Sequence, residues 1–132
     1  MTVDDDLAIR RLLAEYCRHV DDARFAAAAA LFTTDGAFVM GDDQPTGRHE
    51  LASWWEAQQP PHRRGRHISG EPIVDVDGDR ATVSSDFLFV RWIRGVLTLE
   101  LAGRYHDRCV RGDDGWRIER RVVELLEPLP PR

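Results

Sequence analysis

The 132-residue sequence contains only two cysteines, Cys17 and Cys109. Both fall on apolar faces of predicted elements, where a free thiol packs as a small hydrophobic side chain. The first residues show no basic segment followed by an apolar run, the pattern of a secretory signal. Two cysteines without such a signal are typical of a reducing compartment and not of a disulfide framework, so we expect a cytoplasmic protein.

Long apolar runs and ligand-binding motifs are also missing. No apolar run approaches the ~18 residues that a membrane span needs, so we expect no membrane partner. The five histidines include no pair at i, i+4 and there is no cysteine cluster, which disfavours a metal site. The sequence has no glycine-rich phosphate loop and no G-x-S-x-G nucleophile turn, and we expect no cofactor.

The charge balance is acidic, with a formal net charge of −5. The one basic run, residues 62–67, is short and has no interleaved aromatic residues. Such a run is typical of a solvated loop. We therefore expect no nucleic-acid partner.

The first 60 residues show helical periodicity. Apolar residues recur at i, i+3, i+4, i+7, i+8 and i+11, which is one stripe of an α-helix. Thr2 with Asp5 resembles a capping box with Asp in the Glu place. A second helix is predicted over 23–32 and a third over 48–57. The stripe of the first helix consists of Ile9, Leu12, Leu13, Tyr16, Cys17 and Val20.

The rest of the chain has the period of two that indicates β-strands. Turn residues interrupt it at 77–79, 94–95 and 112–115, as in β-hairpins. The proline-rich tail 127–131 cannot continue a strand ladder and is predicted to close the domain. With a short strand before the third helix, the predicted strands are Ala37–Met40, Ile73–Val76, Ala81–Trp92, Val96–Val110 and Trp116–Leu125.

Helices followed by an antiparallel meander are the pattern of an α+β domain. The chain has the length of one domain, so residues 1–132 are predicted to form a single unit. Three N-terminal helices would pack on one face of a curved, mostly antiparallel sheet and form a cone with an internal pocket. Concave apolar sites of this kind bind small molecules, and we expect an apolar small-molecule substrate.

Three residues with acid–base side chains are placed near this pocket. Tyr16 lies in the apolar stripe, although a core tyrosine bonded to a backbone carbonyl is the alternative. Asp21 lies at the edge of the same face, where an unpaired carboxylate is costly, although it could cap the second helix. His67 begins the first strand of the sheet, and its imidazole exchanges protons near neutral pH. A structural histidine is the alternative.

The long strand after residue 95 alternates between two faces. We expect its inward face to consist of Leu99, Leu101, Gly103, Tyr105, Asp107 and Cys109. The outward face would carry Glu100, Arg104, His106 and Arg108. Asp86 is unusual because aspartate is disfavoured in central strands. The predicted substrate-binding residues are Trp54, Asp86, Phe87 and Tyr105.

Short stretches spread along the chain form a recognisable pattern: Tyr16–Asp21, Leu31–Gly36, Arg66-His67, Val76–Ala81, Gly103–Asp107 and Gly115–Ile118. Together they resemble the SnoaL-like branch of the nuclear-transport-factor-2-like superfamily. That branch includes polyketide cyclases, scytalone dehydratase and bile-acid dehydratases. The resemblance covers nearly the whole chain and implies a cystatin-like α+β barrel.

In the dehydratase-like members, a Tyr and an Asp five residues apart act with a His at the first long strand. The resemblance carries these roles to Tyr16, Asp21 and His67 as the catalytic residues. It implies a cofactor-independent dehydratase, isomerase or cyclase acting on a polyketide- or steroid-like molecule. The bile-acid dehydratases carry a further acid where this chain has Val90, so the identical reaction is not implied. Asp86 could substitute for that acid from a different depth.

Under the enzyme hypothesis, His67 is the general base or proton shuttle and Asp21 orients it. Tyr16 donates a hydrogen bond to the developing oxyanion or the leaving hydroxyl. The alternatives are a non-catalytic small-molecule-binding or subunit-assembly domain and an epoxide hydrolase. An approach of Asp21 to His67 in an open pocket would favour the enzyme.

The resemblance also implies a homodimer. We expect it to form through the outer face of the sheet, because that face is long and polar. Its predicted residues are Arg104, His106, Arg108, Glu119 and Arg121.

Overall fold

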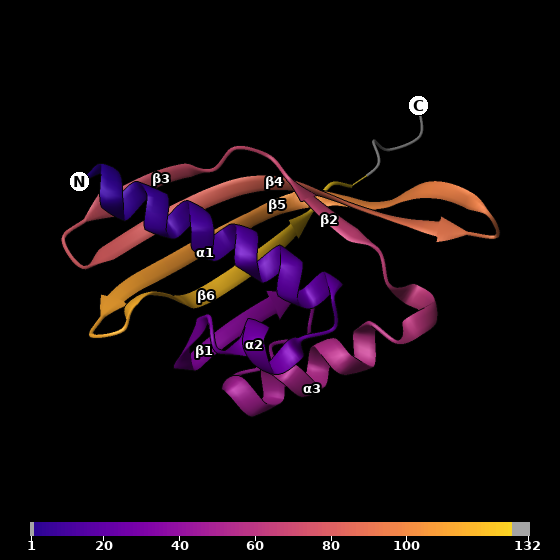
Figure 1. Cartoon of the computed structure of the whole chain (residues 1–132), viewed down its shortest axis with the longest axis horizontal. Coiled ribbons are helices and arrows are strands. Elements are labelled where there is room, and N and C mark those ends of the chain that lie inside the picture. Colours follow the sequence, from indigo (N-terminus) through magenta and orange to yellow (C-terminus); the bar gives the residue numbers. More distant parts are fainter. Residues whose placement is uncertain (1, 128–132) are drawn as a thin grey trace.

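The computed structural model describes residues 2–127 and shows three α-helices and a six-stranded sheet (Figure 1). The predicted tail beyond residue 127 lies outside the described residues. A 3₁₀ turn, Pro61–Arg63, follows the third helix. The helices are α1 (Val3–Asp21), α2 (Phe25–Ala29) and α3 (Arg48–Gln58). The strands are β1 (Phe32–Met40), β2 (Arg66–Ser69), β3 (Ile73–Asp77), β4 (Arg80–Ile93), β5 (Val96–Gly112) and β6 (Gly115–Leu125).

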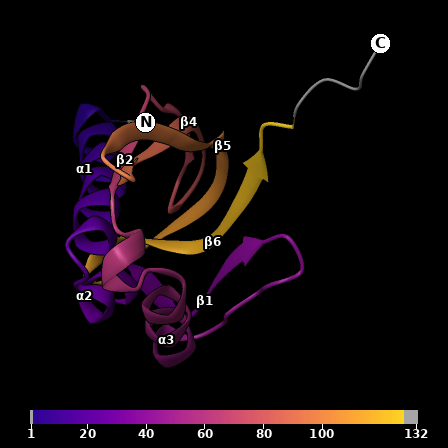
Figure 2. The ribbon, with the colours of Figure 1, turned by 90° about the vertical axis from the view of Figure 1, so that its right-hand side faces the viewer.

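The sheet has the order β1-β6-β5-β4-β2, and β3 also pairs with β4. Only β1 and β6 run parallel among these pairs; the others are antiparallel. Figure 2 shows the sheet curving round, with α1 along its concave side and α3 beside β1. The α+β prediction of helices on a curved, mostly antiparallel sheet is confirmed.

The helix α1 is positioned by its sequence at both ends. Thr2 accepts a hydrogen bond from the Asp5 backbone N–H at 3.1 Å, and three aspartates occupy the positive end of the helix dipole. The predicted apolar stripe is buried along its whole length. Asp21 ends the helix and is buried with that stripe, whereas Asp22 is the C-cap.

The second predicted helix is too long. The helix spans only Phe25–Ala29, and β1 begins at Phe32, within the range predicted as helix and turn. The register of β1 against β6 shifts between Phe32 and Ala37. A Cβ on Gly36 would lie 2.8 Å from the Phe32 Cβ, so glycine is needed there. The turn-like residues 33–36 therefore form an irregularity inside a strand and not the end of a helix.

A bulge in the β4–β5 pair inverts one predicted face. Phe89 pairs with Leu101 while Val90 pairs with Leu99, so Glu100 is an extra residue in β5. Beyond such a bulge the strand exchanges its inward and outward positions. Leu99, predicted to face inward, is 55% exposed. Glu100, predicted to face outward, lines the internal pocket.

A second bulge corrects the prediction for Arg121. Arg108 pairs with Arg120 while Cys109 pairs with Ile118, so Glu119 is an extra residue in β6. Arg121 consequently faces the interior and is 1% exposed, although the unbroken alternation predicted it on the outer face.

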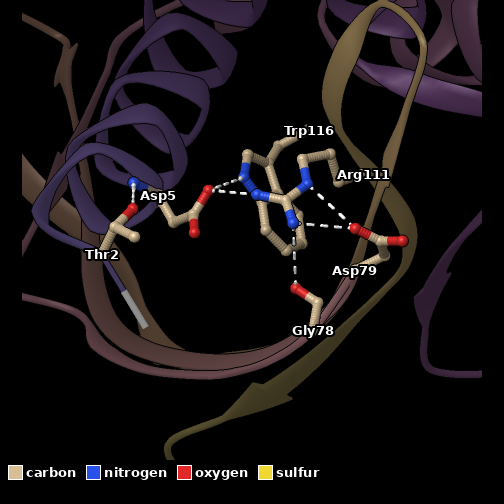
Figure 3. A network of polar contacts seen from close by, with 6 residues as sticks. All are labelled: Thr2, Asp5, Gly78, Asp79, Arg111 and Trp116. Atoms are coloured by element: carbon tan, nitrogen blue, oxygen red, sulfur yellow. Dashed lines mark hydrogen bonds and ion pairs between the residues drawn. The ribbon is translucent and has the colours of Figure 1, made fainter.

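One polar network ties the start of α1 to two hairpins (Figure 3). The Asp5 carboxylate accepts hydrogen bonds from Trp116 Nε1 at 3.1 Å and from the Arg111 guanidinium at 2.6 Å. Arg111 also contacts Asp79 in the β3–β4 turn at 2.8 Å. These contacts fix α1 across the sheet. Within residues 2–127, no helix is both long and apolar enough to cross a membrane.

Candidate active site

A pocket of about 260 Å³ lies between α1, α3 and the concave face of the sheet. Its interior is mostly aromatic. Gln58 and Arg63 in its lining are exposed, so the pocket opens to solvent between α3 and the following 3₁₀ turn. The lining consists of Tyr16, Val20, Phe38, Met40, Trp54, Trp55, Gln58, Gln59, Arg63, His67, Phe87, Phe89, Glu100, Leu101, Tyr105 and Val123.

Asp21 and His67 form a hydrogen-bonded pair beside this pocket. The His67 ring Nδ1 lies 2.5 Å from Asp21 Oδ1, and the His67 backbone N–H donates to Asp21 Oδ2 at 2.9 Å. The side chain of His67 is 10% exposed and that of Asp21 is 4% exposed. His67 lines the pocket, whereas Asp21 lies behind it. The carboxylate of Asp21 therefore orients the ring and does not cap α2, the alternative considered for it.

The local chain explains how His67 comes to face inward. Gly65 lies so close to β4 that a Cβ there would be 2.1 Å from the Val90 carbonyl oxygen. This close approach brings β2 into register with β4, where His67 is opposite Phe89. The two rings lie 4.7 Å apart between centroids. The imidazole is thus held by the hydrogen-bonded carboxylate of Asp21 on one side and the Phe89 ring on the other.

Tyr16 lines the same pocket from α1. Its ring centroid lies 6.5 Å from that of His67 and 5.8 Å from that of Trp55. Burial raises the pKa of the Tyr16 phenol above its ordinary value, so the hydroxyl keeps its proton and can donate it in a hydrogen bond. The structure brings together the three residues predicted to be catalytic.

Of the four predicted substrate-binding residues, three line the pocket and one does not. Trp54, Phe87 and Tyr105 are lining residues. Asp86 lies on the outer face, where Arg104 donates to it at 2.6 Å and its side chain is 67% exposed. Since Asp86 and Phe87 are neighbours in a strand, they point to opposite faces and only one can line the pocket. The expectations for Asp86 are corrected accordingly.

Two polar groups near the pocket escaped prediction because each depends on a bulge. Glu100 faces the pocket and binds Arg91 through two contacts, at 2.5 and 3.0 Å. Arg121 forms a buried pair with Asp107, at 2.7 and 3.0 Å. Arg121 contacts this single aspartate among the described side chains, so an Arg-bridged aspartate pair, as in an epoxide hydrolase, is not present there.

Neither cysteine is placed to act as a nucleophile. Both thiols are buried, and burial raises the pKa of Cys17 and raises that of Cys109 to about 12. A thiol that stays protonated is unreactive. In the described part of the chain, no group of three or more His, Cys, Asp or Glu side chains is arranged to hold a metal ion.

Known proteins of similar sequence and structure place this arrangement in a family. The uncharacterised protein Rv2910c of Mycobacterium tuberculosis is 33% identical over 132 residues, covering 91% of this chain and 84% of the relative. A variant of Rv3472, a protein of unknown function from the same organism, superposes with a TM-score of 0.87. It is 30% identical and covers 93% of this chain and 72% of its own.

Two structures from Novosphingobium aromaticivorans are each 26% identical to this chain. An NTF2-like protein with a cystatin-like fold has a TM-score of 0.89, covering 95% of this chain and 84% of its own. A protein provisionally assigned as a scytalone dehydratase has a TM-score of 0.78, covering 96% and 89%. The model of the SnoaL-like domain matches residues 1–122. The chain therefore belongs to the SnoaL-like family, with the NTF2-like, cystatin-like fold.

Proposed function

We propose that this protein is a cofactor-independent acid–base enzyme, a dehydratase, isomerase or cyclase, acting on a compact apolar molecule that carries an oxygen function. The observation that carries the proposal is the Asp21–His67 pair. The pair is nearly buried, yet the imidazole reaches the pocket. A purely structural role would not explain why the His67 ring lines an open pocket.

The hydrogen bonds decide which nitrogen of His67 acts. An ionised carboxylate can only accept, so Nδ1 carries the proton that faces Asp21. Nε2 then holds the free lone pair and is the general base. When Nε2 takes a proton from the carbon next to a substrate carbonyl, the imidazolium is stabilised by the adjacent Asp21 charge. The same nitrogen can return the proton to a leaving hydroxyl or to another carbon.

Tyr16 supplies the complementary group. Its protonated hydroxyl donates a hydrogen bond to the substrate oxygen, where negative charge develops as the proton leaves. Because this charge is greater in the transition state than in the substrate, the hydrogen bond lowers the barrier.

The pocket limits the size and chemistry of the substrate. Its volume of about 260 Å³ lies just below the ~300–1,000 Å³ of typical ligand pockets. A molecule of two or three rings fits such a volume better than a full steroid. The aromatic lining favours a flat ring system that can stack. We therefore favour a polyketide-like aromatic or hydroaromatic substrate. The related protein provisionally assigned as a scytalone dehydratase supports that class.

The test is a substrate screen with matched histidine variants. Hydroxylated bicyclic ketones would be incubated with wild type, His67→Gln and His106→Gln, and products identified by mass spectrometry. His106 is a suitable control because it also pairs with a carboxylate, Glu124 at 2.8 Å, but on the outer face. We expect His67→Gln to lose ~10²–10⁴-fold in turnover and His106→Gln to retain it. Equal turnover in His67→Gln would contradict the proposal.

We also propose a homodimer formed through the outer sheet face at the β4–β5 hairpin. This surface, the hairpin patch, is apolar and adjoins the polar part of the outer face, with Arg104 and His106, through which the sequence predicts the contact. Its cross-strand pairs lie on one face, and each side chain is 40–67% exposed. Contiguous apolar surface of this kind marks an interface. Nearby Asp86 and Arg104 carry opposite charges, and a two-fold contact would let each face its counterpart on the second copy. The hairpin patch consists of Ile68, Leu88, Trp92, Leu97 and Leu99.

A further inference from the structure

A buried arginine lies against both tyrosines of the pocket. The Arg121 Cζ lies 3.7 Å from the Tyr105 ring centroid and 4.4 Å from that of Tyr16. Phe87 stacks on Tyr105 with centroids 4.2 Å apart and the rings 17° from parallel. Two groups this close cannot share one face of the ring, so Tyr105 lies between Phe87 and the guanidinium. The Tyr16 and Tyr105 rings, 80° apart, form a corner around the cation.

The cation is held from the side away from the pocket. Asp107 binds Nε and one terminal nitrogen of Arg121, and neither residue lines the pocket. The other terminal nitrogen has no hydrogen-bond partner in the described residues. A buried ion pair is usually no more stabilising than apolar residues of the same volume. Stability alone therefore gives no reason for a guanidinium at this place.

The two rings that Arg121 touches belong to the only tyrosines in the chain. Both phenols are buried, and burial raises the pKa of each above its ordinary value. The Arg121 charge acts in the opposite direction on both pKa values, while Cys17 and Asp107 raise them. The imidazole of His67 faces Tyr16 from β2. Arg121 is thus the nearby cation that stabilises negative charge on both phenol oxygens and lowers both pKa values against the effect of burial.

We propose that Arg121, held by Asp107, is a positioning residue that fixes the rings of Tyr16 and Tyr105 and strengthens their hydroxyls as hydrogen-bond donors toward one substrate oxygen. The catalytic consequence rests on the proposed function; the electrostatic effect does not. In this role of Arg121, Tyr105 binds the substrate oxygen beside Tyr16. The substrate class is then narrowed to molecules whose oxygen gains negative charge in the reaction, such as enolisable ketones.

The presence of only two tyrosines makes the effect measurable without a substrate. Biosynthetic replacement of tyrosine by a fluorinated tyrosine, whose phenol ionises at lower pH, gives a ¹⁹F spectrum that reports on these two residues alone. Their ionisation midpoints would be measured in wild type, in the neutral double variant Arg121→Met with Asp107→Leu, and in Arg121→Lys. The double variant keeps the volume and leaves no unpaired buried charge. Arg121→Lys keeps the charge but not the planar guanidinium, and it provides the second measurement of the midpoints if the double variant fails to fold.

We expect both midpoints to rise by ~1–3 pH units in the double variant, the effect of removing a cation within a few ångströms. Arg121→Lys should shift them less, because the charge remains. Unchanged or lower midpoints in the double variant would overturn the proposal. So would a rise in Arg121→Lys as large as the one expected for the double variant.

Turnover separates this inference from the proposed function. On an active substrate, the double variant should lose kcat with little change in KM, because the tyrosine hydrogen bonds strengthen in the transition state. A rise in the midpoints without turnover on any ketone means that the electrostatic role stands and the proposed reaction fails. Turnover in wild type together with unchanged midpoints in the double variant means that the proposed reaction stands and the electrostatic role of Arg121 fails.

Discussion

Asp21 accepts both of its hydrogen bonds from one residue, His67, which donates its backbone N–H and its ring Nδ1–H. Such a two-point contact fixes the ring orientation and the tautomer together. It also accounts for the burial of a carboxylate at the end of an apolar stripe, because the charge is hydrogen-bonded on both oxygens. The Tyr-x4-Asp spacing on a helix and the family resemblance together predicted this residue, and the resemblance supplied its partner His67, which lies 46 positions away.

The variants Asp21→Asn and Tyr16→Phe should differ in severity. Asparagine keeps the shape but removes the charge that stabilises the imidazolium, and it can present an N–H to Nδ1 and reverse the tautomer. We expect a turnover loss of ~10²–10⁴-fold for Asp21→Asn and a smaller one for Tyr16→Phe, which removes one donor. Steady-state kinetics on the identified substrate, with melting temperatures as the control for folding, would measure both. The reverse order would contradict the assigned roles.

The elements were predictable to different degrees, for physical reasons. The burial of Ile9, Leu12 and Tyr16 follows from a helical period that no tertiary contact has to modify. The faces of β5 and β6 could be predicted only as far as their bulges. One extra residue, Glu100 in one strand and Glu119 in the other, inverts every position beyond it. A bulge depends on how two strands pair. The alternation of apolar and polar residues within one strand carries no information about that pairing.

The polar network in Figure 3 makes the attachment of α1 dependent on pH. The hydrogen bond from Trp116, with help from Thr2 and Arg111, holds the pKa of Asp5 below its ordinary value of 3.8. A carboxylate with a lowered pKa stabilises the fold above its unfolded pKa. That stability is lost as the pH falls through the folded pKa, below about 4.

Asp5→Asn should therefore be destabilised relative to wild type at pH 6, and the difference should shrink below about pH 4. Urea unfolding at several pH values would measure it. Asp4→Asn is the matched control, since Asp4 is an exposed neighbour in the same helix turn with no side-chain contact among the described residues. A difference between Asp5→Asn and wild type that stays constant from pH 6 to about pH 2 would contradict this role.

At the scale of the described molecule, two apolar regions bear on function, the pocket and the hairpin patch. The pocket and the fold were predictable from the order of elements and from the family resemblance. The hairpin patch was not, because the bulge at Glu100 turns Leu99 outward. A cytoplasmic location stays a prediction from the sequence.

Trp92, 67% exposed in the hairpin patch, should be essential to the dimer. We expect wild type to be a dimer by light scattering, with an interface of about 1,600 Å² in total, and Trp92→Glu to be a monomer. Leu7→Glu is the control, because Leu7 is 57% exposed but lies on α1. A monomeric wild type at high micromolar concentration, or a Trp92→Glu variant that stays dimeric, would count against this interface.

The proposed function requires that His67 Nε2 removes a proton from a carbon atom of a molecule held in the pocket. The most direct measurement is deuterium incorporation next to the carbonyl of a bicyclic ketone in D₂O, followed by NMR. Exchange requires only proton removal and return, so it does not depend on the later steps. We expect exchange to be faster with wild type than with His67→Gln by ~10²–10⁴-fold. Equal exchange rates for the two proteins, both above the rate in buffer, would contradict it.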